Sequence, residues 1–381
     1  MGDHQTVDIW LLTSVLILAG IGLVMVYSSS MYLSIDQDGS GSFYIKKQAI
    51  RLMLGLFMMM MLTKINYRGY AKIAPVLLVA GFILLIVLLI QKHISGERVE
   101  RWLRIGSLVF QPSEFMKIFL ILFLSAALAG MGDKIREFKN GFFPLIVVIA
   151  VTSVLVVVEP DLGIAGLIMI TGFYLLFIGR AKLLHLAMVA VPAVFSLIYI
   201  VNNVSYMRRR WDIFIHPEQD PDAAWQITQS IIGIGSGGLF GVGLGNSSQK
   251  IHFLPYSHTD FVFSIFAEEC GFIGSMAILV LMFILVYRGL KIARQAPDMF
   301  GFYLASGISM MIGFQTFINI GVTTAVLPTT GMTLPFISYG GSSLLLLFCM
   351  TGILLNISKQ GSYERRLSRE FGIRLHRRVM T

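Results

Sequence analysis

Long apolar segments constrain the fold of this chain more than any other feature. Ten segments approach the roughly 20 residues that an α-helix needs to cross a bilayer, and they lie at 9–27, 50–65, 73–90, 112–130, 142–158, 162–179, 183–201, 261–287, 302–322 and 343–357. Since 56% of the residues are hydrophobic and only 13% are charged, the chain has more apolar surface than a soluble core of 381 residues can bury. The sequence therefore predicts an all-α integral membrane protein of about ten transmembrane helices.

Basic residues between these segments indicate the orientation. Cytoplasmic loops of membrane proteins are enriched in Lys and Arg, and a cytoplasmic N-terminus makes every inside loop of this chain basic. The residues are Lys64, Arg68, Lys72, Lys134, Arg136, Lys139, Arg180, Lys182, Arg288, Lys291 and Arg294. The formal charge of +9 therefore describes a basic cytoplasmic face, and we expect no nucleic-acid partner. Both termini should be cytoplasmic, with a tail at 1–8, a membrane domain at 9–357 and a basic tail at 358–381.

Four stretches then face the extracytoplasmic side, and the function should lie among them. They are residues 91–111, 159–161, 202–260 and 323–342. The long loop 202–260, between spans seven and eight, is too apolar for a solvated linker. The stretch 323–342 has no charge and contains several Pro and Gly residues, which suits a segment that re-enters the membrane against other helices.

A glycine-rich run, GIGSGGLFGVGLGNSSQK at 233–250, lies within the long outer loop. It lacks the GxxxxGK[ST] spacing of a nucleotide-binding loop. Its glycines are better explained by close approach of the backbone to a bulky ligand or to a neighbouring helix.

Asp260 is the candidate general base. It stands where the polar outer loop enters the eighth span, and a carboxylate at the edge of hydrocarbon has a raised pKa, which suits a base. A helix N-cap is the alternative role, because Asp caps helices well. Glu268 lies about two turns further along, near the same helical face, and is a candidate structural partner or substrate contact, whereas Glu269 points away.

Two further candidate positions lie at the outer ends of other spans. Glu114 and Lys117 are three residues apart at the start of the fourth helix, so they share a face and can form an ion pair. Asp161 lies at the tight outer corner between spans five and six.

Arginines on the outer side indicate a phosphate-bearing ligand. Arg101 precedes the fourth span, and Arg208, Arg209 and Arg210 form a cluster in the long loop. A guanidinium group binds phosphate through two parallel hydrogen bonds. Contact with lipid headgroups is the alternative for this cluster.

The sequence carries no pattern typical of a metal site. Cys270 and Cys349 are the only cysteines and lie in apolar stretches, so neither a disulfide framework nor a cysteine metal site is indicated. The histidines lack the spacing of metal ligands. We expect no metal ion held by the protein alone.

Five motifs together resemble the SEDS family of membrane proteins. They are QPSEFMK at 111–117, PDLG at 160–163, HTDF at 258–261, NIGV at 319–322 and LPFISYGGSS at 334–343. They follow the order of the family and cover nearly the whole chain. Within the family, GVGLGNSSQK at 241–250 looks most like the division branch, and the elongation and sporulation branches are near relatives. One departure is Glu159, where the family often has Gln.

The resemblance implies a function as well as a fold. Members of this family polymerise lipid II into β-1,4 glycan strands at the outer face of the bacterial cell membrane, working with a class B penicillin-binding protein. It implies that Asp260 is the base and that Glu114, Lys117 and Asp161 lie in or beside the active cavity. His258 and Ser338 lie in family motifs and are further candidate substrate contacts.

The resemblance also leaves several partners and roles to be tested. The division branch implies a place at the septum with other divisome proteins, and the membrane supplies lipid partners. A divalent cation, Mg²⁺ or Mn²⁺, could help the arginines to stabilise the diphosphate that leaves. The alternatives are a lipid II flippase or transporter, a scaffold for division proteins, and a role in elongation or sporulation.

Overall fold

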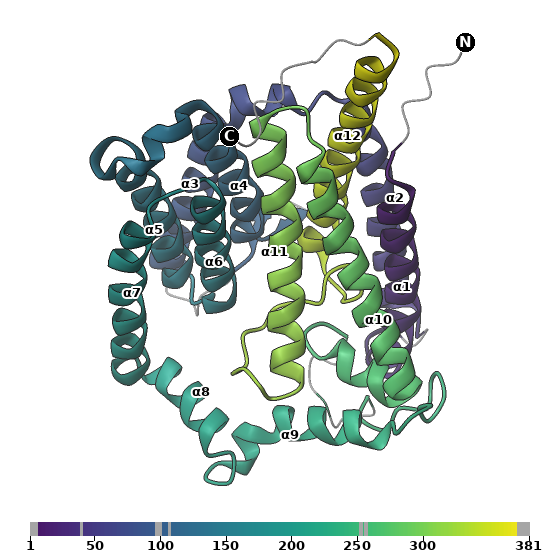
Figure 1. The fold of residues 1–381 in the computed structure, drawn as a ribbon. Helices are drawn as coiled ribbons and strands as arrows, with labels where there is room; N and C mark the ends of the chain where they lie inside the picture. The colour runs from purple at the N-terminus through teal and green to yellow at the C-terminus, as the bar shows by residue number, and fades with distance from the viewer. Residues whose placement is uncertain are drawn as a thin grey trace.

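All ten apolar segments are helices in the computed structural model (Figure 1), which describes residues 7–38, 41–95, 101–105, 108–250, 254 and 258–371. These helices are α1 (Ile9–Asp38), α2 (Phe43–Lys64), α3 (Arg68–Ser95), α4 (Pro112–Met131), α5 (Phe143–Val158), α6 (Leu162–Ile178), α7 (Leu183–Asn203), α10 (Val262–Arg294), α11 (Met299–Thr323) and α12 (Gly341–Phe371). The predicted tails lie partly outside the described residues, at 1–6 and 372–381. The predicted all-α membrane fold is thus confirmed in the described part of the chain.

Length and apolarity by themselves identify eight of these helices as membrane spans within the described residues. The two others differ for simple reasons. Helix α6 has 17 residues, and α2 carries Lys46, Lys47 and Arg51 in its first half. Helix α12 is longer than its apolar segment, because it continues from Ile357 to Phe371.

Several shorter elements lie between the spans. The long outer loop folds into α8 (Ser205–Ile215) and α9 (Pro221–Ser236), which connect α7 to α10 at one end of the bundle (Figure 1). Strands β1 (Leu103–Ile105) and β2 (Leu108–Phe110) form an antiparallel pair before α4. A 3-10 helix, Gly132–Arg136, and a π-helix, Phe138–Phe142, connect α4 to α5.

Ion pairs at the other end of the bundle agree with the predicted orientation. Arg288, near the end of α10, donates to Asp8 at the start of α1, with Nε 3.0 Å from Oδ1. Arg68 donates to Asp298 before α11 and to Glu364 of α12, at 2.6 and 2.9 Å. Every one of these residues belongs to a segment that the basic-loop pattern assigns to the cytoplasm. The pairs therefore join the cytoplasmic ends of α1, α3, α10, α11 and α12.

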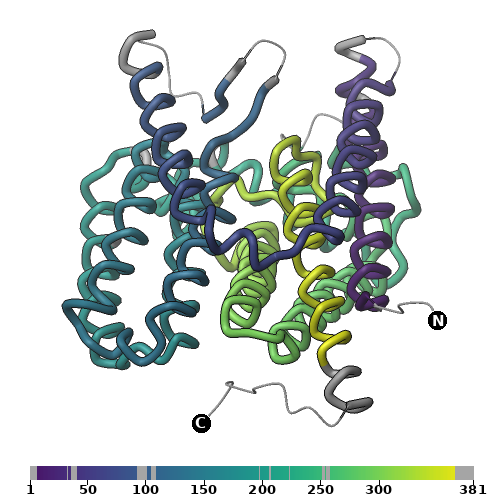
Figure 2. The backbone as a smooth tube through the Cα atoms, turned by 90° about the horizontal axis from the view of Figure 1, so that it is seen from above, coloured from purple at the N-terminus to yellow at the C-terminus, as the bar shows by residue number. Residues whose placement is uncertain are grey.

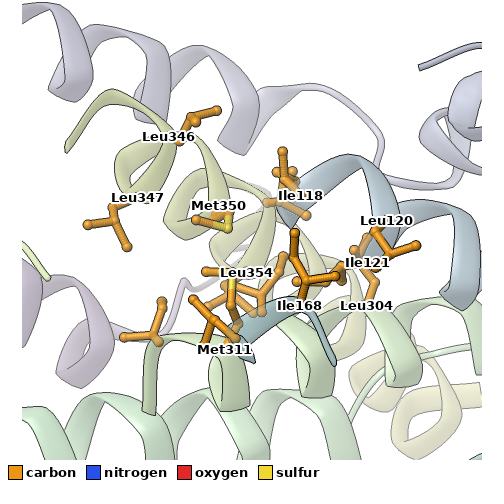
Figure 3. Packing of buried hydrophobic residues seen from close by; sticks show 14 of the residues in the cluster. Ile118, Leu120, Ile121, Ile168, Leu304, Met311, Leu346, Leu347, Met350 and Leu354 are labelled. Atoms are coloured by element: carbon orange, nitrogen blue, oxygen red, sulfur yellow. The ribbon is translucent and has the colours of Figure 1, made fainter. Parts of the chain in front are cut away.

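The core lies among α4, α6, α11 and α12. Figure 3 shows side chains of these helices meeting in one cluster, among them Ile121, Ile168, Met311, Met350 and Leu354. Helix α12 is the most enclosed span and α7 the most exposed. Because lipid tails are as apolar as leucine, such a core is held by close packing rather than by exclusion of water. The enclosed helices therefore form the packed centre of the bundle.

A break in α10 explains the glycine-rich run of the outer loop. Gly271 has φ 68° and ψ −166°, a conformation open essentially to glycine alone. The run packs its backbone against this break, since Val242 N donates to Glu268 O at 3.0 Å and Phe272 N donates to Gly238 O at 2.9 Å. Of the two expectations for these glycines, approach to a neighbouring helix is confirmed.

We expect Gly271→Ala to destabilise the protein strongly. A Cβ at this position would lie 2.3 Å from Gly241 N and 2.6 Å from Leu239 O, so the backbone of the glycine-rich run would have to move. The positive φ adds conformational strain of about 1–3 kcal/mol for an alanine. Thermal unfolding in detergent, followed by size-exclusion chromatography, measures the effect. Gly20→Ala is the control, because a Cβ there meets nothing within 4 Å and a helical Ala should stabilise by about 0.5–1 kcal/mol. Equal melting temperatures for Gly271→Ala and wild type would contradict the packing described.

Candidate active site

Asp260 lies in the turn that enters α10, and it does not cap the helix. The N-cap of α10 is Phe261, whose side chain makes no cap hydrogen bond. Asn319 of α11 fixes this turn instead, since its Nδ2 donates to Asp260 O at 2.9 Å and to Met332 O at 2.6 Å. The N-cap alternative is therefore wrong, and the carboxylate is left for another role. Asn319 was not singled out from the sequence, although it lies in the NIGV motif.

The carboxylate of Asp260 and the guanidinium of Arg101 border one narrow space. Gly331 lies beneath this space, where a Cβ would be 3.6 Å from Asp260 Oδ2 and 3.8 Å from Arg101 Nη1. Burial raises the pKa of Asp260 to about 6, while Arg101 opposes the rise, Asp161 adds to it and Arg210 opposes it. Asp260 is therefore ionised at neutral pH with a pKa that suits a general base.

Arg101 is held by the outer corner between α5 and α6. Its Nη2 donates to Pro160 O at 2.6 Å, and its Nη1 lies 3.7 Å from Asp161 Oδ2. Asp161 also caps α6 by accepting from Ile164 N at 3.1 Å, and Gln111 Nε2 donates to its other oxygen at 2.9 Å. Two of the sequence-predicted residues, Arg101 and Asp161, are thus brought together with Asp260.

Glu114 and Lys117 form the predicted ion pair inside the bundle. Lys117 Nζ lies 2.8 Å from Glu114 Oε2, and both side chains are buried. Lys117 also donates to Gln315 Oε1 at 3.2 Å, and Gln315 Nε2 donates to Thr333 O at 3.0 Å. The pair is therefore tied to α11 and to the stretch 323–342. Leucine and isoleucine side chains of α4 and α6 line a narrow pocket beside Lys117.

The three arginines of α8 do not act together. Arg210 donates to Thr329 O at 2.8 Å, and its charge lowers the pKa of Asp260. Arg208 and Arg209 are exposed and lie 3.8 Å from Asp212 and 3.2 Å from Asp220. Only Arg210 therefore belongs to the surroundings of Asp260, and spacing along the chain could not distinguish it from its neighbours.

Glu268 has different partners from those that the helical face suggested. Its carboxylate accepts from the hydroxyl of Ser247, from Ser248 N at 3.0 Å, from Ser248 Oγ at 2.8 Å and from Gln249 N at 3.4 Å. These donors belong to the end of the glycine-rich run. In the structure Glu268 therefore anchors the outer loop, and its predicted contact with substrate stays a prediction.

Glu269 anchors the same loop from the other side of α10. Lys250 Nζ lies 2.9 Å from Glu269 Oε1, Ser28 of α1 donates to the same oxygen at 2.6 Å, and the Lys250 and Glu269 side chains are almost fully buried. A buried ion pair of this kind costs about 3–5 kcal/mol when one partner is removed. The loop that leads to Asp260 is thus fastened to both α10 and α1.

His258 and Ser338 hold the loops on which they lie. Ser338 Oγ accepts from Leu334 N at 2.8 Å, and Tyr339 N donates to His258 O at 2.9 Å. Burial lowers the pKa of His258 to about 4, so its ring is neutral at pH 7. His258 lies two residues before the candidate base, and the contacts of both residues with substrate stay predictions.

The surroundings of Asp260 offer few side chains that could bind a metal ion. Within the described residues no three His, Cys, Asp or Glu side chains gather closely enough to bind one. Asp161 and Asp260 stand beside Arg101, whose charge already compensates them. A divalent cation would therefore need additional oxygens from a bound ligand.

Comparisons with known proteins agree on one family. The sequence model named for FtsW, RodA and SpoVE, described as "Cell cycle protein", matches residues 9–363. A "Probable peptidoglycan glycosyltransferase FtsW" of Geobacter sp. (strain M18) is 37% identical over 353 residues, covering 92% of this chain and 96% of the relative. "Stage V sporulation protein E" of Bacillus subtilis is 37% identical over 358 residues, covering 93% and 98%.

A solved structure of a peptidoglycan synthase complex, described as coordinating polymerization and crosslinking, contains a similar chain. The TM-score is 0.76 at 28% identity, with 93% of this chain and 98% of that chain covered. The similarity extends over the multi-span bundle and supports the membrane fold.

We expect Glu159→Gln to stabilise the protein at alkaline pH. Glu159 is fully buried at the α5–α6 corner, its oxygens accept no hydrogen bond from the residues that the structure describes, and burial raises its pKa from 4.5 to about 8. The folded state thus keeps a proton that the unfolded chain loses, and this contribution to stability falls as the pH rises from about 4.5 to about 8. The melting temperature of wild type should fall between pH 6 and 9, and that of Glu159→Gln should fall less.

At pH 9 the difference should be at least about 2 °C in favour of Glu159→Gln. The control is Glu137→Gln, which changes an exposed glutamate on the cytoplasmic side and should leave the pH dependence as in wild type. A lower melting temperature for Glu159→Gln at every pH would mean that this carboxyl is ionised and paired.

Proposed function

Since this chain belongs to the SEDS family of FtsW, RodA and SpoVE, we propose that it polymerises lipid II at the outer face of the cell membrane with Asp260 as general base. It is a multi-pass membrane protein and a peptidoglycan glycosyltransferase by family. One observation carries the assignment of the base. The Asp260 carboxylate, with its raised pKa, faces Arg101 across Gly331 at the outer end of the bundle.

The proposed reaction is an in-line displacement. Asp260 takes the proton from the 4-hydroxyl of an acceptor sugar as the oxygen attacks the anomeric carbon of a second lipid-linked sugar. The bond from that carbon to the diphosphate breaks, and the lipid diphosphate leaves with the bonding electrons. Because the oxygen attacks the side of the anomeric carbon opposite to the diphosphate, an α-linked donor gives a β-1,4 linkage.

Two arginines are positioned to stabilise the charge on the leaving diphosphate. Arg101 lies at the same space as the Asp260 carboxylate, and Arg210 lies close enough to lower the pKa of Asp260. Cations that are already in place where negative charge develops lower the free-energy barrier of the reaction, because the surroundings need not reorganise. Lys117 has a different role in this proposal, because its charge is already paired with Glu114 and it connects α4 to Gln315.

A divalent cation remains a proposal of its own. With no group of three metal-ligating side chains among the described residues, Mg²⁺ or Mn²⁺ would be held by diphosphate oxygens of the substrate together with Asp161 or Asp260. Bound there, the cation would neutralise diphosphate charge. The two aspartates lie beside Arg101, so such an ion would share the diphosphate with the guanidinium.

The partner and the place in the cell follow from relatives. A relative of known structure lies in a peptidoglycan synthase complex that joins polymerization with crosslinking. We therefore propose a class B penicillin-binding protein as the partner of this chain. The similarity to FtsW supports a role at the division septum with other divisome proteins, while the similarity to the sporulation protein keeps that role as the alternative.

The flippase alternative has less support. Moving a diphosphate through the bilayer requires polar groups along the whole path. Charged residues gather at the outer end around Asp260 and at the cytoplasmic end around Arg68 and Asp298, and the charge of Lys117 between these ends is already paired with Glu114. The pocket that Lys117 and Thr171 help to line is otherwise apolar, mainly leucine and isoleucine.

Replacing the base should abolish polymerisation. We expect Asp260→Asn to lower the rate of glycan formation from purified lipid II at least about 100-fold, because loss of general base catalysis costs about that much. The assay contains the penicillin-binding partner with its crosslinking activity blocked. Asp212→Asn, the same change at an exposed site of α8, is the matched control and should retain the wild-type rate. Equal rates for all three proteins would remove Asp260 from catalysis.

The rate should also report the ionisation of Asp260. Because the pKa of Asp260 is about 6 and the base must be ionised, activity should fall about tenfold per pH unit below pH 6 and level off above pH 7. Arg101 lowers this pKa, so Arg101→Gln should move the inflection to higher pH as well as slow the reaction. An inflection that stays in place in Arg101→Gln would contradict the assignment of the base.

A further inference from the structure

Residues 238–245, the middle of the glycine-rich run, bind α10 at the point where that helix breaks. Phe272 N, just after the break, donates to Gly238 O at 2.9 Å. Gly243 N donates to Glu269 O, just before the break, at 3.1 Å. The segment 238–245 is therefore fixed at the level of the break, and the depth of the break in the bilayer is also the depth of the segment.

Two helices measure this depth from the same cytoplasmic end. Arg288 of α10 pairs there with Asp8, which directly precedes α1. Phe272 stands 16 residues from Arg288 along α10, which corresponds to about 24 Å. Ser28, whose hydroxyl binds Glu269, stands 20 residues from Asp8, which corresponds to about 30 Å along α1. Since the hydrocarbon layer is about 30 Å thick and any tilt of a helix shortens its height, the break lies in the outer part of that layer.

The chain around the segment 238–245 is suited to this depth. No charged residue occurs between Asp222 and Lys250. Irregular backbone inside hydrocarbon must find its hydrogen-bond partners within the protein, and the contacts with α10 supply such partners. Gly237 and Gly241 permit this close approach, because a Cβ on either residue would lie 2.1 Å from a backbone oxygen of α10.

The segment also presents an apolar surface. Its exposed apolar side chains are Leu239, Phe240, Val242 and Leu244. With 79% of its surface exposed, Phe240 is the most exposed large apolar side chain of the described residues. In Figure 2 the teal-green chain that follows α9 lies at the rim of the bundle beside α1, where lipid can reach it.

The lipid-facing side of α10 continues this surface toward the cytoplasm. Phe272, Met276, Val280 and Phe283 are exposed and recur at the spacing of one helical face. Phe272 is the residue that binds Gly238, so the two apolar surfaces meet at the break. A continuous exposed apolar surface of this kind is avoided in water, whereas acyl chains match it.

We propose that residues 238–245 insert into the outer leaflet of the membrane, where Leu239, Phe240 and Leu244 contact lipid acyl chains. The sequence placed this segment in an extracytoplasmic loop, and the proposal moves it into the bilayer. Insertion also accounts for the packing against α10, because the segment lies against Glu268 and Glu269, whose charges are costly where they meet hydrocarbon. The inference does not depend on the proposed reaction, since it concerns only how the outer loop is held.

A charge at position 240 tests the proposal in lipid nanodiscs. Phe240→Asp should lower the melting temperature of the full chain by at least about 2 °C, because a carboxylate is costly in hydrocarbon. In water the same change would be neutral or stabilising, since most of this side chain contacts no other part of the protein. Phe240→Leu keeps the site apolar and should melt like wild type. A melting temperature for Phe240→Asp equal to or above that of wild type would overturn the proposal.

Spin labels measure the depth without a charge. Labels are attached to Phe240→Cys, to Phe283→Cys on the lipid-facing side of α10 and to Gln219→Cys in the exposed turn between α8 and α9. The background carries Cys270→Ala and Cys349→Ala and is checked for an unchanged melting temperature. Oxygen concentrates among acyl chains and a nickel complex in water, so the labels at 240 and 283 should collide mainly with oxygen and the label at 219 mainly with nickel.

Two results would contradict insertion. Frequent collision of the label at Phe240→Cys with nickel would place the segment in water. Little collision with either reagent would mean that protein, such as a second copy of the chain, covers the segment in place of lipid.

Discussion

An unpaired polar group in a membrane protein is costly, and this cost governs where the chain can place its charges. Glu268 accepts hydrogen bonds from three consecutive residues of the outer loop, and Glu269 binds Lys250 and Ser28. Both carboxylates lie just before the break of α10 at Gly271. Because these contacts are buried, the loop cannot leave α10 without exposing charges to hydrocarbon. The turn that carries Asp260 therefore starts from a fixed position.

The uncharged stretch 323–342 performs a comparable task on the other side of Asp260. Asn319 joins the backbone of Asp260 to that of Met332, and Gln315 joins Lys117 to Thr333. Irregular backbone at membrane depth is tolerated only where other protein groups satisfy it. Here the amide side chains of α11 satisfy it, and the stretch in turn brings Gly331 beneath the carboxylate and the guanidinium. Packing and chemistry thus depend on the same few hydrogen bonds.

Much of the candidate site could be predicted from the sequence, because charged residues in or beside apolar segments are rare enough to be noticed. Asp260, Arg101 and Asp161 were identified in this way and do lie together, and the pair of Glu114 and Lys117 followed from helical spacing. Asn319, Gln315 and Gln111 were missed as positioning residues, since uncharged amides raise no such signal.

Hydrophobic length and the distribution of basic residues are local properties that the bilayer selects directly, and they were enough to predict the membrane environment and the ten helices. Which polar residues meet depends instead on how the chain folds. Arg210 reaches Thr329 while Arg208 and Arg209 face outward, and Glu268 binds the outer loop although its helical face suggested Asp260. The physical reason is that a side chain's partner depends on where segments far apart in the chain are packed, and burial then makes the few available partners obligatory.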